Sequence, residues 1–198
     1  MSTMSTAEFW DGAADDFDER PDHGLRDPMV RSAWANLLLR LLPPSPARVA
    51  DIGCGTGSLT LLMCEAGHLV SGLDISPAMA ELARAKVARS GHKAEFAVGD
   101  AAAPPWGPGT FDVVLTRHVL WALDDPSAAL MRWIDLLAPG GRLVLIEGLW
   151  WTGAGMSAAH VCDLVHRYRV EAEVTALDDA VFWGEPIRDE RFVVVSRN

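Results

Sequence analysis

The pattern of hydrophobic positions changes character near residue 45. Before it, apolar residues recur at the spacing of one helix face, and Pro43-Pro44 then ends the pattern, because proline lacks the N–H that a helix interior needs. We therefore expect residues 1–45 to form a helical N-terminal extension. The apolar positions are Val30, Trp34, Leu37, Leu38 and Leu41.

From residue 46 onward, short apolar runs alternate with segments that begin and end like helices. This order predicts a parallel sheet whose strands are buried on both faces. Ser76-Pro77 and Asp125-Pro126 are placed to start helices, and Gly140-Gly141 is expected to end the second one. A further helix is expected over residues 156–168. The expected strands are 49–52, 69–73, 94–98, 111–116, 143–147, 170–174 and 192–196.

These elements predict one α/β domain, a three-layer sandwich around a seven-stranded, mostly parallel sheet with an antiparallel last strand. Residues 1–45 would form a helical lid over the carboxyl edge of the sheet, and residues 46–198 the core of the domain. The chain has 198 residues, of which 49% are hydrophobic, so it can bury the core that one such domain needs.

Charge excludes several classes of partner. The formal net charge is −10, and Lys86 and Lys93 are the only lysines, so a basic surface for nucleic acid or for an anionic membrane is not expected. The chain does not begin with a basic leader, and none of its apolar runs approaches a membrane span, so we expect a cytoplasmic protein. Its partners should be small molecules. The oligomeric state stays open.

The cysteines and histidines do not predict a metal site. Cys54, Cys64 and Cys162 lack CxxC spacing and are expected to be reduced structural thiols. His160, Cys162 and His166 share a predicted helix, but neither an acid nor a further ligand accompanies them.

A glycine-rich turn, DIGCGTG over residues 51–57, follows the first strand and opens a helix. Such a turn lets backbone N–H groups approach a ligand closely. A dinucleotide fingerprint would need another glycine at Ser58 or Thr60, and the phosphate loop GxxxxGK[ST] is absent, which disfavours NAD and ATP. Asp51 before the turn suits a cofactor with an ammonium group and no phosphates. Asp74, after the second strand, could hold a ribose diol. S-adenosylmethionine fits both requirements.

Five motifs in this order resemble the class I S-adenosylmethionine-dependent methyltransferase superfamily, in particular its small bacterial members that begin with a short helical cap. The resemblance covers about residues 8–197 and implies methyl transfer. Because the lid is short, the acceptor is expected to be a small molecule. The motifs are VADIGCGTG (49–57), LDISPAMAELARAK (73–86), FAVGDAAAPPW (96–106), FDVVLTRHVLWAL (111–123) and LAPGGRLVLIEG (137–148).

The resemblance also implies which residues surround the cofactor. Asp51 and the glycines would surround its methionine part, and Met79 would pack on the adenine. Asp100 would bond the adenine amino group, although it could equally form a turn, and Asp74 could equally be a helix-capping acid. The expected cofactor-binding residues are Asp51, Gly53, Cys54, Gly55, Gly57, Asp74, Ile75, Met79, Asp100, Ala101 and Thr116.

On the acceptor side, His118 is the leading candidate for a catalytic base, because it directly follows the fourth strand. Its titration would make the rate rise with pH through a pKa near 6.5. Alternatively, His118 only orients the substrate. His23, in the lid, is a second catalytic candidate. Aromatic walls suit a sulfonium or a flat substrate, with core packing as the alternative. The expected substrate contacts are Trp10, Arg117, His118, Trp121 and Trp150.

Two other functions stay open at this point. The protein could consume S-adenosylmethionine by cyclising or cleaving it, or it could be a cofactor-binding partner subunit without catalytic activity. Arg117, His118 and His23 argue against the second alternative, since a non-catalytic subunit does not need polar groups on the acceptor side. The sequence leaves the acceptor open, and also the choice among O-, N-, C- and S-methylation.

Overall fold

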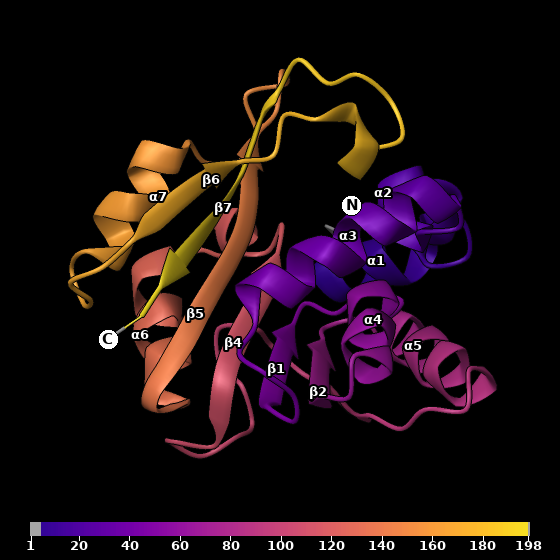
Figure 1. The fold of residues 1–198 in the computed structure, drawn as a ribbon, viewed down its shortest axis with the longest axis horizontal. Coiled ribbons are helices and arrows are strands. Elements are labelled where there is room, and N and C mark those ends of the chain that lie inside the picture. Colours follow the sequence, from indigo (N-terminus) through magenta and orange to yellow (C-terminus); the bar gives the residue numbers. More distant parts are fainter. Residues whose placement is uncertain (1–4, 198) are drawn as a thin grey trace.

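Within residues 5–197, which the computed structural model describes, seven strands form one mixed sheet (Figure 1). Their order is β3-β2-β1-β4-β5-β7-β6. β7 is antiparallel to both β5 and β6, and the other neighbouring pairs are parallel, so the predicted sheet is confirmed. The strands are β1 (Arg48–Ile52), β2 (Leu69–Asp74), β3 (Glu95–Val98), β4 (Phe111–Arg117), β5 (Leu137–Leu149), β6 (Glu173–Ala176) and β7 (Glu190–Ser196).

Helices cover both faces of the sheet and complete the three layers (Figure 1). One face carries α3 (Pro28–Leu41), α4 (Ser58–Glu65) and α5 (Pro77–Arg89), and the other carries α6 (Pro126–Asp135) and α7 (Ala158–Val165). Successive strand residues enter different cores: Val113 packs under α3 and α4, whereas Val114 packs under α6 and α7. In such a sheet, ligands bind at the carboxyl ends of the strands.

Two helix starts agree with the sequence. Ser76 caps α5 by accepting a hydrogen bond from the backbone N–H of Met79, and Asp125 caps α6 in the same way through Ala128. Proline follows each cap, where its missing N–H costs nothing. These caps fix where α5 and α6 begin.

Other expected boundaries are wrong. α6 ends at Asp135, and Gly140-Gly141 lies inside β5, at the register shift between the Phe111–Leu137 and Val113–Arg142 pairs. The expected strand over residues 170–174 begins only at Glu173, and the expected helix over residues 156–168 is limited to α7. Local propensity does not locate these ends, because pairing with a distant strand decides where β5 and β6 begin.

The N-terminal extension has two parts. α1 (Thr6–Ala13), η1 (Phe17–Glu19) and α2 (Pro21–Gly24) lie over the carboxyl edge, whereas α3 packs its apolar face on the sheet and belongs to a layer. We call residues 6–24 the lid. Residues 1–4 of the expected lid lie outside the described residues. In the described part of the chain, none of the helices has the length and apolar character needed to cross a membrane.

Polar contacts join the lid to the rest of the domain. They connect α1 to the start of α5, η1 to the glycine-rich turn and to α5, and α2 to the end of β4. The contacts are Ser76 Oγ to Asp11 Oδ1 (2.5 Å), Thr56 Oγ1 to Asp18 Oδ1 (2.5 Å), Lys86 Nζ to Asp18 Oδ2 (2.8 Å) and Arg117 Nη1 to the Asp22 carbonyl (2.6 Å).

Candidate active site

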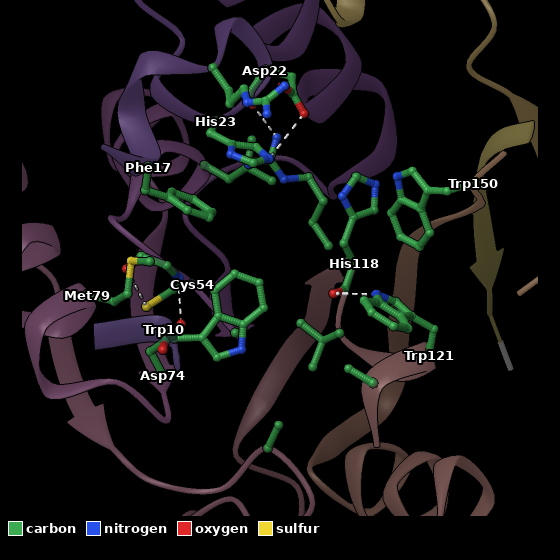
Figure 2. Close-up of a pocket in the computed structure, with 18 of the residues that line it drawn as sticks. Trp10, Phe17, Asp22, His23, Cys54, Asp74, Met79, His118, Trp121 and Trp150 are labelled. Carbon is green, nitrogen blue, oxygen red and sulfur yellow. Dashed lines mark hydrogen bonds and ion pairs between the residues drawn. The ribbon is translucent and has the colours of Figure 1, made fainter. Parts of the chain in front are cut away.

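A cavity of about 960 Å³ lies between the lid and the carboxyl edge of the sheet (Figure 2). Small-molecule sites usually measure about 300–1,000 Å³, so this one is large. Fifteen of the predicted site residues line it: Trp10, His23, Asp51, Gly53, Cys54, Gly55, Asp74, Ile75, Met79, Asp100, Ala101, Arg117, His118, Trp121 and Trp150.

Two expected cofactor residues do not line the cavity. Gly57 has a φ of +77°, and a Cβ there would lie 2.8 Å from the Cβ of Ala83, so this glycine allows α4 to approach α5. Thr116 is fully buried in β4, and its hydroxyl has no hydrogen-bond partner within residues 5–197. In the structure, both residues therefore contribute to the packing of the domain and do not line the cavity.

Asp74 joins the glycine-rich turn to the start of α5. Its Oδ2 accepts a hydrogen bond from the Gly55 N–H (2.8 Å), and its Oδ1 accepts one from the Ser76 N–H (2.9 Å). Burial raises the pKa of this carboxyl group. Each oxygen can accept a second hydrogen bond, so Asp74 can bind a diol while it keeps these structural contacts. Asp74 can therefore support the start of α5 and bind a ribose at the same time.

Asp51 is a buried acid beneath the same turn. Thr60 Oγ1 donates a hydrogen bond to its Oδ2 (2.5 Å), and within residues 5–197 Asp51 forms no ion pair. Burial raises its pKa to about 6. A bound ammonium group would favour the ionised form and repay this cost. The site therefore fits a cofactor with an amino group here.

The remaining predicted cofactor residues lie at the same end of the cavity. Met79 is almost fully buried at the start of α5. Asp100 is exposed and accepts a hydrogen bond from the Ala102 N–H (2.8 Å), which is the turn expected as its alternative role. The Ala101 carbonyl accepts a hydrogen bond from the Trp133 indole (2.8 Å), which anchors this turn on α6.

His118 occupies the opposite end of the cavity, among indole rings (Figure 2). Its φ of +60° is left-handed, which is uncommon for a residue with a side chain. Trp150 meets the imidazole edge-on at 5.1 Å, and Trp183 stacks on it at 6.0 Å. Trp121 donates a hydrogen bond to the His118 carbonyl (3.0 Å). The imidazole Nε2 is buried, and within residues 5–197 it has no hydrogen-bond partner.

Burial lowers the pKa of His118 well below 6.5, and the nearby Arg117, Arg191 and His23 lower it further. The ring is therefore neutral at physiological pH. The titration expected near pH 6.5 is moved to more acidic pH. A weakly basic imidazole accepts hydrogen bonds, but it is a poor acceptor of a full proton.

Arg117 and His23 connect the lid with this end. The Arg117 guanidinium donates to the Asp22 carbonyl and lies 5.1 Å from the centre of the Trp34 ring. The His23 ring stacks on Phe17 at 4.2 Å, and its Nε2 lies 3.5 Å from Asp22 Oδ2. Burial lowers the pKa of His23, while Asp22 raises it. Both predicted residues thus line the cavity, His23 from the lid and Arg117 from the end of β4.

Sequence reasoning missed Glu147, which holds the turn after His118. It is fully buried in β5, and its Oε1 accepts hydrogen bonds from the backbone N–H groups of Val119 (3.1 Å) and Leu120 (2.8 Å). Burial raises its pKa to about 8. The signal for it was an acid at the end of the apolar run LVLI.

A further group of lining residues comes from β7 and the segment before it, and it includes Trp183, Asp189 and Arg191. Their sequence carries no motif. Only the insertion of β7 between β5 and β6 brings this segment beside His118.

Metal binding finds no support in the described part of the chain, where no three His, Cys, Asp or Glu side chains are grouped around a common point. The three cysteines have free thiols, as expected.

Comparisons with known proteins indicate one family. Residues 50–145 match the family described as "Methyltransferase domain". The "Ubiquinone biosynthesis O-methyltransferase" of Xanthomonas euvesicatoria pv. vesicatoria is 34% identical over 140 residues, which cover 69% of this chain and 54% of that protein. The "Demethylmenaquinone methyltransferase" of Thermus thermophilus is 38% identical over 108 residues, which cover 54% of this chain and 49% of that protein. The chain thus spans about half the length of these curated relatives.

A solved structure shows the same fold. The crystal structure of a SAM-dependent methyltransferase from Methanosarcina mazei matches with a TM-score of 0.66 at 20% identity, covering 82% of this chain and 96% of that chain. At this identity the likeness concerns the fold alone, and function has to be argued from the site.

Proposed function

This chain belongs to the class I S-adenosylmethionine-dependent methyltransferase superfamily, and on that premise we propose that it transfers a methyl group from S-adenosylmethionine to a small-molecule acceptor. One observation carries the proposal. A single cavity has the glycine-rich turn with Asp51 and Asp74 at one end, and His118 with its indole walls at the other. The two relatives named for ubiquinone biosynthesis and for demethylmenaquinone support a small acceptor.

At the cofactor end, this chain's own groups would bind and orient. Asp51 would take the amino group, Asp74 the ribose hydroxyls, and Met79 the adenine face. S-adenosylmethionine supplies an electrophilic methyl group next to a cationic sulfur. Gly53 and Gly55 have φ values of +71° and +53° and line the cavity, so the backbone can approach the cofactor closely.

At the acceptor end, positioning would be the main contribution. Holding the acceptor atom in line with the methyl group turns a bimolecular step into a unimolecular one. The neutral His118 would accept a hydrogen bond from the acceptor, and the lid would exclude water. The Trp121 and Trp150 rings contact each other, with centres 5.3 Å apart and an interplanar angle of 59°, and a flat molecule would stack on the face of one of them.

The test is product analysis with the full chain. It would be incubated with S-adenosylmethionine and candidate metabolites, and mass spectrometry would identify the products. S-adenosylhomocysteine with a methylated acceptor supports methyl transfer, whereas methylthioadenosine indicates cofactor cleavage. Calorimetry with S-adenosylhomocysteine, NAD and ATP tests the cofactor itself. Tighter binding of NAD or ATP than of S-adenosylhomocysteine would overturn the assignment.

A further inference from the structure

The guanidinium of Arg191 is held between two indole rings at the acceptor end of the cavity. Its Cζ lies 4.8 Å from the centre of the Trp150 ring and 5.2 Å from that of Trp183. The Arg191 side chain is only 9% exposed, and its Nη2 forms an ion pair with Asp189 Oδ2 at 2.9 Å. Arg191 is thus a buried cation fixed in one place.

Some hydrogen-bond donors of the Arg191 guanidinium have no acceptor in the described part of the chain. Within residues 5–197, Nε and Nη1 of Arg191 have no hydrogen-bond partner. A buried donor without a partner is unfavourable, and more so when it is charged. Neither nitrogen touches solvent, so a ligand in the cavity reaches them only after a neighbouring side chain, such as the half-buried Trp150, has turned. A negatively charged ligand oxygen that accepts hydrogen bonds from these two nitrogens would offset the unfavourable burial.

Acidic and basic side chains both line the cavity. Asp74 lies across the cavity from His118 (Figure 2), and Asp51 and Asp100 also line it. Asp51 acts on Arg117 as well. Around the His118 ring, Arg117 and Arg191 act as positive charges, as does His23 when it is protonated. They raise the potential where the acceptor would bind, and low-dielectric walls strengthen this effect.

The acids at the acceptor end leave part of this charge uncompensated. Asp189 pairs with Arg191 alone, and the Asp22 carboxylate lies beside His23, while the Arg117 hydrogen bond goes to the Asp22 backbone carbonyl. Glu185 lines the rim and is exposed. The Asp22 and Asp51 carboxylates also act on the Arg117 guanidinium, but within residues 5–197 neither forms an ion pair with it, so they offset its charge only in part.

We propose that the acceptor is a flat carboxylic acid, whose carboxylate lies between the guanidiniums of Arg117 and Arg191 and whose planar part lies against the Trp150 ring. The proposal rests on the proposed function, because it assigns the acceptor of that same site. It adds Arg191 and Trp183 to the binding residues, and it excludes neutral and cationic molecules as the preferred acceptors.

The experiment compares planar acids with their neutral amides. The probes are benzoate and benzamide, 4-hydroxybenzoate and 4-hydroxybenzamide, and cinnamate and cinnamamide. Each is titrated into the full chain saturated with S-adenosylhomocysteine, and its affinity is measured by calorimetry and by tryptophan fluorescence. The readout is the ratio of acid to amide affinity, since shape and stacking are the same within a pair. We expect a ratio of about 10 or more for at least one pair, as charge-assisted hydrogen bonds give.

Three variants separate charge from packing. Arg191→Gln should reduce the ratio to about 1, because it removes the charge. Asp189→Asn should increase the ratio, since it removes the partner that neutralises Arg191. Arg89→Gln, an exposed substitution at the end of α5 with the same change in net charge, is the matched control and should leave the ratio unchanged.

The outcomes distinguish this inference from the proposed function. If S-adenosylhomocysteine does not bind the wild-type chain, the proposed function fails. If it binds, but none of the acids binds more tightly than its amide, the inference is wrong and the proposed function stands. The inference is also wrong if Arg191→Gln weakens acid and amide equally, because Arg191 then acts only in packing.

Discussion

Glu147 offers a test of the site that does not depend on knowing the acceptor. Its carboxyl group is buried in β5, where Oε1 accepts two backbone N–H groups from the turn after His118 and Oε2 has no partner within residues 5–197. Glu147→Gln keeps an oxygen acceptor for both N–H groups and cannot ionise. We expect this variant to be as stable as the wild type at acidic pH and more stable at about pH 8.

The magnitude follows from the pKa. Burial raises it from 4.5 to about 8, so the folded protein keeps a proton that the unfolded chain releases. Glu147 therefore does not reduce the free energy of unfolding below pH 4.5. As the pH rises from 4.5 toward about 8, the free energy of unfolding falls. Each pKa unit corresponds to about 1.36 kcal/mol, so the whole shift is worth about 5 kcal/mol as an order of magnitude.

The assay is urea unfolding of wild type and variant over the pH range from 6.5 to about 8. Asp51 has its pKa near 6, and the lowered pKa values of His118 and His23 lie below 6.5, so these groups change protonation mainly outside this range. The wild type should lose about 1.4 kcal/mol per pH unit relative to Glu147→Gln.

Glu95→Gln, at the exposed start of β3, is the matched control and should follow the wild type. If Glu147→Gln shows the same pH dependence as the wild type, Glu147 is ionised in the folded protein and the reasoning fails.

Three further predictions concern the cavity. Asp74→Asn should weaken S-adenosylhomocysteine binding roughly 10- to 100-fold in calorimetry, and it should also lower the melting temperature, because Asp74 holds two backbone N–H groups. His118→Asn should lower kcat more than cofactor affinity, and asparagine tolerates the left-handed backbone at this position. The wild-type rate should not change with pH above 6.5, and a rise of the rate through pH 6.5 would contradict the lowered pKa of His118. Lys86→Met removes the ion pair to Asp18 in the lid and should speed S-adenosylhomocysteine release about fivefold in stopped-flow measurements, whereas an unchanged rate would show that this contact does not hold the lid closed.

The sequence predicted the fold because the helix-capping residues and the periodicity of apolar residues indicate the same elements. The buried strands read as apolar runs, and Ser76 and Asp125 cap the helices that follow β2 and β4. The start of β5 and the position of β6 were not predictable from neighbouring residues. Both depend on pairing with strands that are distant in the chain.

For the site, the sequence located the cofactor end better than the acceptor end. The residues of the cofactor end follow consecutive strands and form motifs, whereas Trp183 and Arg191 become neighbours of His118 only through the antiparallel β7. The lowered pKa of His118 could not be predicted from its motif either, since burial is the main cause and Arg191 and His23 add to the effect of the neighbouring Arg117.

β7 adds residues from the end of the chain to one end of the cavity. The family match over residues 50–145 contains Asp51 and Asp74 and also Arg117 and His118 of the opposite end, whereas Trp150, Trp183 and Arg191 lie beyond it. If Trp150, Trp183 and Arg191 contact the acceptor as proposed, substitutions after residue 149 should change acceptor preference while the residues proposed to bind the cofactor keep their sequence. A chimaera that exchanges only the segment after residue 149 would test this expectation.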